Sequence, residues 1–227
     1  MVGKTMEQEA KRNTVKLVLV ISLITIFLLS MTSCSLFNLV SEDRDVSGFN
    51  KVALYGSTDL FITQGDETSL TVEAQENLMP YIETTVSGGT LELRKKQVRH
   101  PKQWRGINYY LTVKDLDGIS VYGSGDVISS DFVTDTTIVI TIDGSGDVKL
   151  AGEAKKQEIT IQGSGDYSAR DFKSSECIVK IFGSGDVTVN VTDSLDITID
   201  GSGDVSYAGS PSVNQSIFGS GDVKNIK

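Results

Sequence analysis

Six aspartates supply the carboxylates whose type and spacing could support chemistry. They end six copies of Gly-Ser-Gly-Asp, and the first glycines of successive copies are 21, 19, 20, 18 and 18 residues apart. The first glycines are Gly123, Gly144, Gly163, Gly183, Gly201 and Gly219, and the aspartates are Asp126, Asp147, Asp166, Asp186, Asp204 and Asp222. If the copies stack, neighbouring carboxylates repel by about 1 kcal/mol per pair in water. Solvation, backbone N–H donors or a bound cation must offset that repulsion.

Backbone bonding is the interpretation we favour, because Asp in a Gly-rich turn commonly accepts hydrogen bonds from backbone N–H groups. A column of cations is the alternative. The pattern differs from the calcium-binding nonapeptide repeat, since here Asp follows the second glycine directly and occurs once per repeat. No phosphate-binding glycine pattern opens a helix either. We therefore predict no catalytic residue, metal site or cofactor, and we assign the motif to a structural ladder of turns.

The residues around each motif indicate the elements that position it. β-Branched residues alternate along the sequence before the first glycine and resume directly after the aspartate, as in Ile140, Ile142 and Val148. Such alternation is typical of short strands with one buried face. A period near twenty residues leaves room for two or three strands but not for a strand and a helix. The sequence predicts an all-β, right-handed parallel β-helix (β-solenoid) of roughly 20-residue coils, about nine coils in all.

Two corner geometries are compatible with the motif. In one, each Gly-Ser-Gly-Asp makes a turn, with glycine in a positive-φ conformation or close to the next coil. In the other, the strand alternation continues through the motif, so that both glycines face inward and Ser and Asp form outward ladders. The sequence leaves both open.

The first 33 residues have the features of a secretion signal. Basic residues precede the apolar run Leu17–Leu29, and Met31-Thr32-Ser33-Cys34 resembles a bacterial lipobox. We predict a lipoprotein signal peptide over residues 1–33 with lipid attached to Cys34; an uncleaved signal anchor is the alternative. Either one places the chain in the bacterial cell envelope, membrane-anchored and extracytoplasmic, at the outer membrane, the periplasm or the surface.

The rest of the chain is divided into a tether, residues 34–48, and one β-solenoid domain, residues 49–227. Gly56-Ser57-Thr58-Asp59 resembles the motif with Thr in place of the second glycine, which suggests a degenerate N-terminal part of the same plan. Further strands are expected at 60–63, 69–73, 90–94 and 109–113, and one helical turn within 77–82. The net charge is −9, and residues 1–33 contribute +2, which leaves −11 for the remainder. This excludes nucleic acid as an expected partner.

A basic segment interrupts this acidic domain. Residues 94–105 read RKKQVRHPKQWR and contain the only His and the only Trp of the chain. A solvated loop is the plainer interpretation. As a candidate binding loop for a glycan, anionic lipid or protein partner, its residues are Arg94, Lys95, Lys96, Arg99, Lys102, Trp104 and Arg105.

The second cysteine and the last coil allow two further predictions. Cys177 alternates with Lys180 and shares a face with Val179 and Ile181, so we predict a small buried residue and not a nucleophile. The final coil should expose strand edges. Lys224 and Lys227 either protect that edge, or the edge pairs with a second copy of the chain.

With the lipobox and the motif ladder on one chain, the sequence resembles the family called putative auto-transporter adhesin head GIN domain. The resemblance covers residues 49–227, and Gly106-Ile107-Asn108 matches the tripeptide in the family's name. It implies a noncatalytic, β-helical envelope domain, and it transfers no catalytic residue.

Three functions follow as hypotheses. The first is an adhesin or binding module, supported by the tether and by a long solenoid wall. The second is a structural component that assembles through its coil ends. The third, a carbohydrate-active enzyme, needs a pair of acid and base carboxylates in one groove. The repeated aspartates occupy equivalent turn positions, so the enzyme is the least favoured of the three.

Overall fold

The computed structural model describes residues 38–96 and 106–226, and the described residues from Leu39 onward form one compact unit. Its strands are β1 (Leu39–Arg44), β2 (Lys51–Gly56), β3 (Asp59–Gln64), β4 (Ser69–Gln75), β5 (Ile82–Ser87), β6 (Thr90–Lys95), β7 (Asn108–Val113), β8 (Gly118–Gly123), β9 (Val127–Gly144), β10 (Val148–Gly163), β11 (Tyr167–Gly183), β12 (Val187–Gly201), β13 (Val205–Gly209), β14 (Ser212–Gly219) and β15 (Val223–Asn225). One 3₁₀ turn, η1 (Met79–Tyr81), lies within the range predicted for a helical turn. The four further strands predicted lie within β3, β4, β6 and β7.

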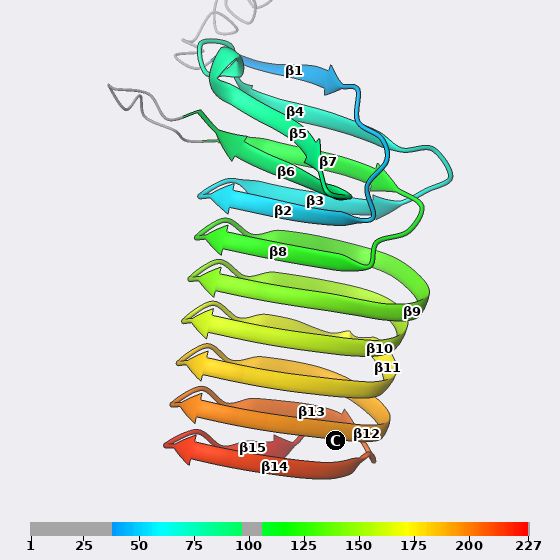
Figure 1. Cartoon of the computed structure of the whole chain (residues 1–227), viewed down its shortest axis with the longest axis vertical. Coiled ribbons are helices and arrows are strands. Elements are labelled where there is room, and N and C mark those ends of the chain that lie inside the picture. The colour runs from blue at the N-terminus through cyan, green and yellow to red at the C-terminus, as the bar shows by residue number, and fades with distance from the viewer. Residues whose placement is uncertain (1–37, 97–105, 227) are drawn as a thin grey trace, which may run out of the picture. The chain divides into compact units, whose positions relative to one another are not determined.

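The regular part is a β-solenoid, which confirms the predicted fold class. In Figure 1 each coil has a front layer and a back layer. The front layer holds β2, β6, β8, the second halves of β9 to β12, and β14; the back layer holds β3, β7, the first halves of β9 to β12, β13 and β15. Successive coils pair in parallel, and the pairing keeps every motif in register, as with Gly144, Gly163 and Gly183.

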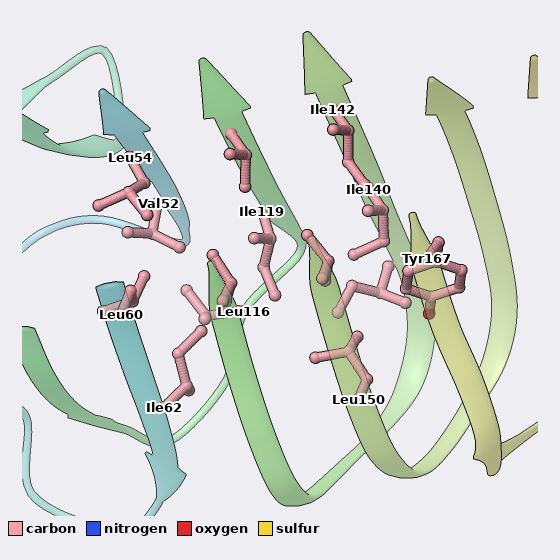
Figure 2. Packing of buried hydrophobic residues seen from close by; sticks show 14 of the residues in the cluster. Val52, Leu54, Leu60, Ile62, Leu116, Ile119, Ile140, Ile142, Leu150 and Tyr167 are labelled. Atoms are coloured by element: carbon pink, nitrogen blue, oxygen red, sulfur yellow. The ribbon is translucent and has the colours of Figure 1, made fainter. Parts of the chain in front are cut away.

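The core lies between the two layers and is almost wholly apolar. Figure 2 shows Val52, Leu54, Ile119, Ile140 and Ile142 from the front layer directed at Leu60, Ile62 and Leu150 from the back layer. Alternation of buried and exposed residues along each strand produces this arrangement, because successive side chains point to opposite faces. Stacking is required for stability, since one coil alone would leave its apolar side chains exposed at its upper and lower edges.

The prediction of nine coils is wrong. The solenoid has about five regular turns, because in the N-terminal part only β6 and β7 stack in parallel, on β2 and β3, while β4 and β5 pair antiparallel. After β2 and β3 complete the front and back of a first coil, the chain makes an excursion through β4 to β7, and the stack resumes at β8. Within this excursion β4 pairs antiparallel with β7 and with β1, and β5 pairs antiparallel with β6. Turn residues such as Gly88 and Gly89 favour such a hairpin.

Variation in coil length is confined to the bend opposite the motif. The register of neighbouring coils shifts between Lys149 and Gly152, between Ala154 and Lys156, and between Ala169 and Lys173. By contrast, the strands leading into the motif pair without interruption. Repeats of 18 to 21 residues can therefore keep one corner fixed while the other takes up the difference.

One polar network crosses the apolar core. The buried Tyr167 hydroxyl donates to Gln157 Oε1 at 2.6 Å, and Gln157 Nε2 donates to Ser174 Oγ at 2.8 Å. Gln157 is 0% exposed and Ser174 is 2% exposed. Because an unpaired polar group in this environment is costly, the three side chains depend on one another.

Burial predicts a loss of stability at alkaline pH. It raises the pKa of Tyr109, Tyr167 and Cys177 above their ordinary values of 10.0, 10.0 and 9.0, with nearby Arg44 partly opposing the shift at Tyr109. The unfolded chain then loses protons that the folded chain keeps. We expect the free energy of unfolding to fall from about pH 9 upward, by at most about 1.4 kcal/mol per pH unit for each group. Urea unfolding between pH 8 and 11 measures this slope; Tyr167→Phe should reduce it, and an unchanged slope in that variant would contradict the assignment.

The sequence-based predictions for the N-terminus fall mostly outside the described residues. Residues 1–33 and Cys34 are not among them. Part of the predicted tether, Leu39–Arg44, forms β1 and pairs with β4, so the folded unit begins earlier than residue 49. In the described part of the chain, no helix has the length and apolar character needed to cross a membrane.

Candidate functional site

Each motif forms the corner between the front and back layers, and its geometry combines the two that the sequence left open. Gly163 has φ of +128° and ends a strand, while Gly165 is buried directly against the preceding coil. The N–H groups of Ser164 and Gly165 both donate to the Gly144 carbonyl, at 2.9 and 3.1 Å. Ser164 and Asp166 point outward. The corner is therefore a turn, and it still presents outward ladders of Ser and Asp.

The aspartate ladder is held by hydrogen bonds between coils. The backbone N–H of Asp166 donates to Asp147 Oδ1 at 2.9 Å, and the N–H of Asp186 donates to Asp166 Oδ1 at 2.8 Å. The same bond joins every neighbouring pair from Asp126 to Asp222, at 2.8–2.9 Å. It also joins Asp126 N–H to Asp59 Oδ1 at 3.1 Å, so the degenerate motif is the first rung of the ladder.

These bonds supply the offset that the like charges require. Each carboxylate from Asp59 to Asp204 accepts a backbone N–H of the next coil, a charge-assisted bond that is stronger than a neutral one. In residues 38–96 and 106–226, no three His, Cys, Asp or Glu side chains come together as a metal site. The ladder residues from Asp59 to Asp204 thus join coils, each through one carboxylate oxygen, Oδ1, that accepts a backbone N–H of the next coil.

A second ladder lies on the outer face of the front layer. We call it the front column: the residue directly before the first glycine of each coil. Strand register places its members side by side, and they are Tyr55, Tyr122, Asp143, Gln162, Phe182, Asp200 and Phe218. Phe182 is 45% exposed and Phe218 is 66% exposed. The front column therefore holds four aromatic rings, two carboxylates and one amide.

Two tyrosines of the front column stack on each other. The rings of Tyr55 and Tyr122 lie 4.9 Å apart between centroids and are inclined by 17°. The Arg94 guanidinium lies 4.9 Å from the Tyr55 centroid and forms an ion pair with Glu92. A cation over a tyrosine ring is attracted by the ring's quadrupole. Arg94, Tyr55 and Tyr122 thus form a rigid stack along the solenoid axis.

Two hollows adjoin this stack, and together we call them the front groove. One, of about 300 Å³, is lined by Tyr55, Tyr122, Glu92, Thr90, Ser120 and Lys51, with the small residues Ala53 and Gly118 beneath. The other, of about 430 Å³, is lined by Tyr55, Gly56, Glu83, Arg94 and Lys95. Both open to solvent and share Tyr55. The front groove offers ring edges and faces next to hydroxyl, carboxylate and guanidinium groups.

The predicted basic binding loop lies partly in this groove. Arg94 and Lys95 line it, and burial lowers the pKa of Lys95. Lys96 follows β6, donates to the Pro80 carbonyl at 3.2 Å and lies 4.0 Å from Glu83. Arg99, Lys102, Trp104 and Arg105 lie outside the described residues.

Other candidates do not join this site. Cys177 is buried, and burial raises the pKa of its thiol, which disfavours the reactive thiolate. A third hollow, of about 550 Å³, lies at the bend opposite the motif and is lined by Gln64, Asp66, Asp115 and Asp131. There Gln64 donates to the carbonyls of Lys114 and Val133 and accepts from Val133 N–H, so it joins the ends of β3 and β7 to the bend within β9.

Sequence reasoning missed the tyrosine stack. A signal was available, because Tyr55-Gly56-Ser57 and Tyr122-Gly123-Ser124 are identical tripeptides at the same position of the repeat. Once the degenerate motif is aligned with the first full one, stacking of the two rings follows.

Comparisons with known proteins agree with this architecture. The chain is similar to the crystal structure of a putative adhesin from Bacteroides fragilis, with 25% identity, a TM-score of 0.70, and coverage of 83% of this chain and 97% of that one. A putative lipid binding protein from Parabacteroides distasonis has the same fold, at 23% identity and a TM-score of 0.55, with 84% and 97% covered. No curated protein matches the chain.

The family comparison covers most of the solenoid. Residues 48–211 match the family described as "Putative auto-transporter adhesin, head GIN domain". This range includes the front groove and five of the six full motifs. The chain belongs to that family of adhesin-like head domains.

Proposed function

We propose that this protein is a noncatalytic binding module of the cell envelope, and that its front groove binds carbohydrate. The observation that carries the proposal is the Arg94–Tyr55–Tyr122 stack beside an open groove. Aromatic side chains provide a large apolar surface, and nearby polar groups fix the orientation of a ligand.

The shape of the groove favours a sugar. A sugar ring has an apolar face of C–H groups and a rim of hydroxyls. Tyr122 is 37% exposed, and the next residue of the front column, Asp143, has no ring to cover it. Ser120, Thr90 and Glu92 lie within the same groove and can exchange hydrogen bonds with hydroxyls. Because the tyrosines are already stacked, little conformational entropy is lost on binding.

Binding without turnover fits the state of the carboxylates. Glycoside hydrolysis needs one carboxylic acid and one carboxylate flanking the scissile bond. In the front groove Glu92 is paired with Arg94, and Glu83 lies 4.0 Å from Lys96. The ladder aspartates lie at the corner, where one oxygen of Asp147 and one of Asp166 accept backbone N–H groups. These pairings support recognition of a ligand over acid–base chemistry.

The envelope location is proposed from the N-terminal sequence and the family's adhesin description. Lipid on Cys34 or the apolar segment before it attaches the unit to a membrane, as the lipobox pattern indicates. The front layer then presents its outer face to soluble or cell-surface glycans.

Tyr122→Ala tests the site. We expect the full chain in detergent to bind a subset of a glycan array, and the variant to bind the same glycans at least about tenfold more weakly, or about 1.4 kcal/mol. Tyr110→Ala is the matched control, since Tyr110 is 42% exposed and stacks on Phe61 at 5.2 Å in the back layer. Equal loss in both variants, or no glycan bound by the parent, would refute the proposal.

A further inference from the structure

The last coil of the solenoid presents an open strand edge in the front layer. Among the described residues β14 pairs with β12 alone, and β15 pairs with β13 alone. All eight residues of β14 are exposed. Val213 and Ile217 are each 36% exposed, whereas Leu195 and Ile199, their neighbours one coil earlier, are fully buried. The apolar core therefore continues to this edge, and none of the residues that the structure describes covers it.

The edge lacks the usual protection against pairing. Edge strands are normally guarded by charges, by proline within the strand or by bulges. β14 reads SVNQSIFG, with no charge, no proline and an uninterrupted register against β12. The corresponding segments of the four preceding coils each hold a charged residue, such as Asp143, Glu158, Lys180 and Asp196. Lys224, predicted from the sequence to guard the edge, lies on β15 in the back layer.

A polar residue occupies one core position of this strand. The position four residues before the first glycine is Ile119, Ile140, Ile159, Val179 and Ile197 in earlier coils, all buried. In the last coil it is Gln215, which register places beside Ile197. Gln215 therefore lies on the inward face of β14, between Val213 and Ile217.

We propose that two copies of this chain pair β14 to β14 as antiparallel strands, centred on Gln215. In that register Val213 of one copy faces Ile217 of the second copy, and the two Gln215 side chains face each other. Two amides can donate to and accept from one another, since each has an acceptor oxygen and donor hydrogens. No like charges meet along the strands, which is the charge pattern that self-pairing requires.

The symmetry of this pairing limits its size. The same strand is used by both copies, so the contact is isologous and closes at a dimer. The two cores then become continuous across the interface, and the exposed Val213 and Ile217 are covered. The dimer places two front layers along one extended surface, which then carries two copies of the front groove.

A charge exchange at Gln215 tests the proposal. We expect the full chain in detergent micelles to sediment as a reversible dimer over a concentration series. Gln215→Glu and Gln215→Lys should each raise the dissociation constant by at least about tenfold, because like charges then meet at the two-fold axis. An equimolar mixture of the two variants should recover the dimer, which a folding defect would not allow. Gln162→Glu, an exposed residue in the middle of the front column, is the control and should match the parent.

Each other outcome contradicts the dimer. A parent that stays monomeric at every concentration, or variants whose mixture stays dissociated, would overturn the pairing. Open-ended assembly would overturn the isologous arrangement, because head-to-tail contacts do not close.

Discussion

Gly165→Ala is expected to destabilise the folded unit by more than about 3 kcal/mol, or to prevent its folding. A Cβ at this position would lie 2.2 Å from the Gly146 carbonyl oxygen and 2.8 Å from Ile142 Cγ2. The first contact is backbone of the neighbouring coil, and the second is a fully buried core side chain. Neither can move without separating the coils. Overpacking usually costs about 1–3 kcal/mol, because the surrounding core can shift. Here it cannot, so the loss of unfolding free energy should be larger.

Two controls isolate the cause. Ser164→Ala alters an exposed residue in the same corner and should change the free energy of unfolding by less than about 0.5 kcal/mol. Gly88→Ala tests the positive-φ cost alone, since Gly88 has φ of +56° and nothing lies within 4 Å of an added Cβ; it should cost about 1 kcal/mol. Urea unfolding followed by circular dichroism measures all three. If Gly165→Ala is no worse than Gly88→Ala, close coil contact is not what the second glycine provides.

Gln157→Leu is expected to cost about 2–6 kcal/mol, although it places an apolar residue in an apolar core. The change removes the acceptor of the Tyr167 hydroxyl and the donor to Ser174 Oγ. Both partners are buried and are left unsatisfied, at about 1–3 kcal/mol each. Equilibrium unfolding of the full chain measures the loss.

The matched variant removes the whole network. Combining Gln157→Leu with Tyr167→Phe and Ser174→Ala leaves no unpaired hydroxyl, so we expect it to be more stable than Gln157→Leu alone. A triple variant that is less stable than the single one would mean that packing volume, not hydrogen bonding, decides the stability at this place.

The repeat made the coil predictable, and the reasons lie in particular residues. Ile140, Ile142 and Val148 alternate about a glycine corner at a fixed spacing, and few folds other than a stack of coils satisfy that spacing. The aspartates were correctly associated with backbone N–H donors. Their donors were expected within the turn, but they lie in the next coil, as for Asp166 N–H and Asp147 Oδ1. The distance between neighbouring coils determines which N–H reaches each carboxylate, and a single copy of the motif gives no information about that distance.

The rest depended on contacts between segments far apart in sequence. The excursion through β4 to β7 has no repeat, so its antiparallel pairing with β1 could not be obtained from the period. In the sequence Gln157 stands in the polar stretch KKQE, which looks exposed. The strand register places it beside the buried Ile138, on the inward face. The front groove is built from β6, β2 and β8, whose order in space differs from their order in the chain. The period of the repeat predicts contacts between residues one repeat apart, and it does not predict contacts between these non-repeating segments.

The excursion also determines when the first coil can be completed during synthesis. β2 and β3 are synthesised early, but β2 pairs with β8 and β3 pairs with β9. The Asp59 carboxylate accepts its hydrogen bond from the N–H of Asp126, 67 residues later in the chain. Later coils need only the next 18 to 21 residues. Short loops close faster than long ones. The first coil can therefore be completed only after β8 and the start of β9 have been made, whereas each later coil can be added as soon as the next 18 to 21 residues are available.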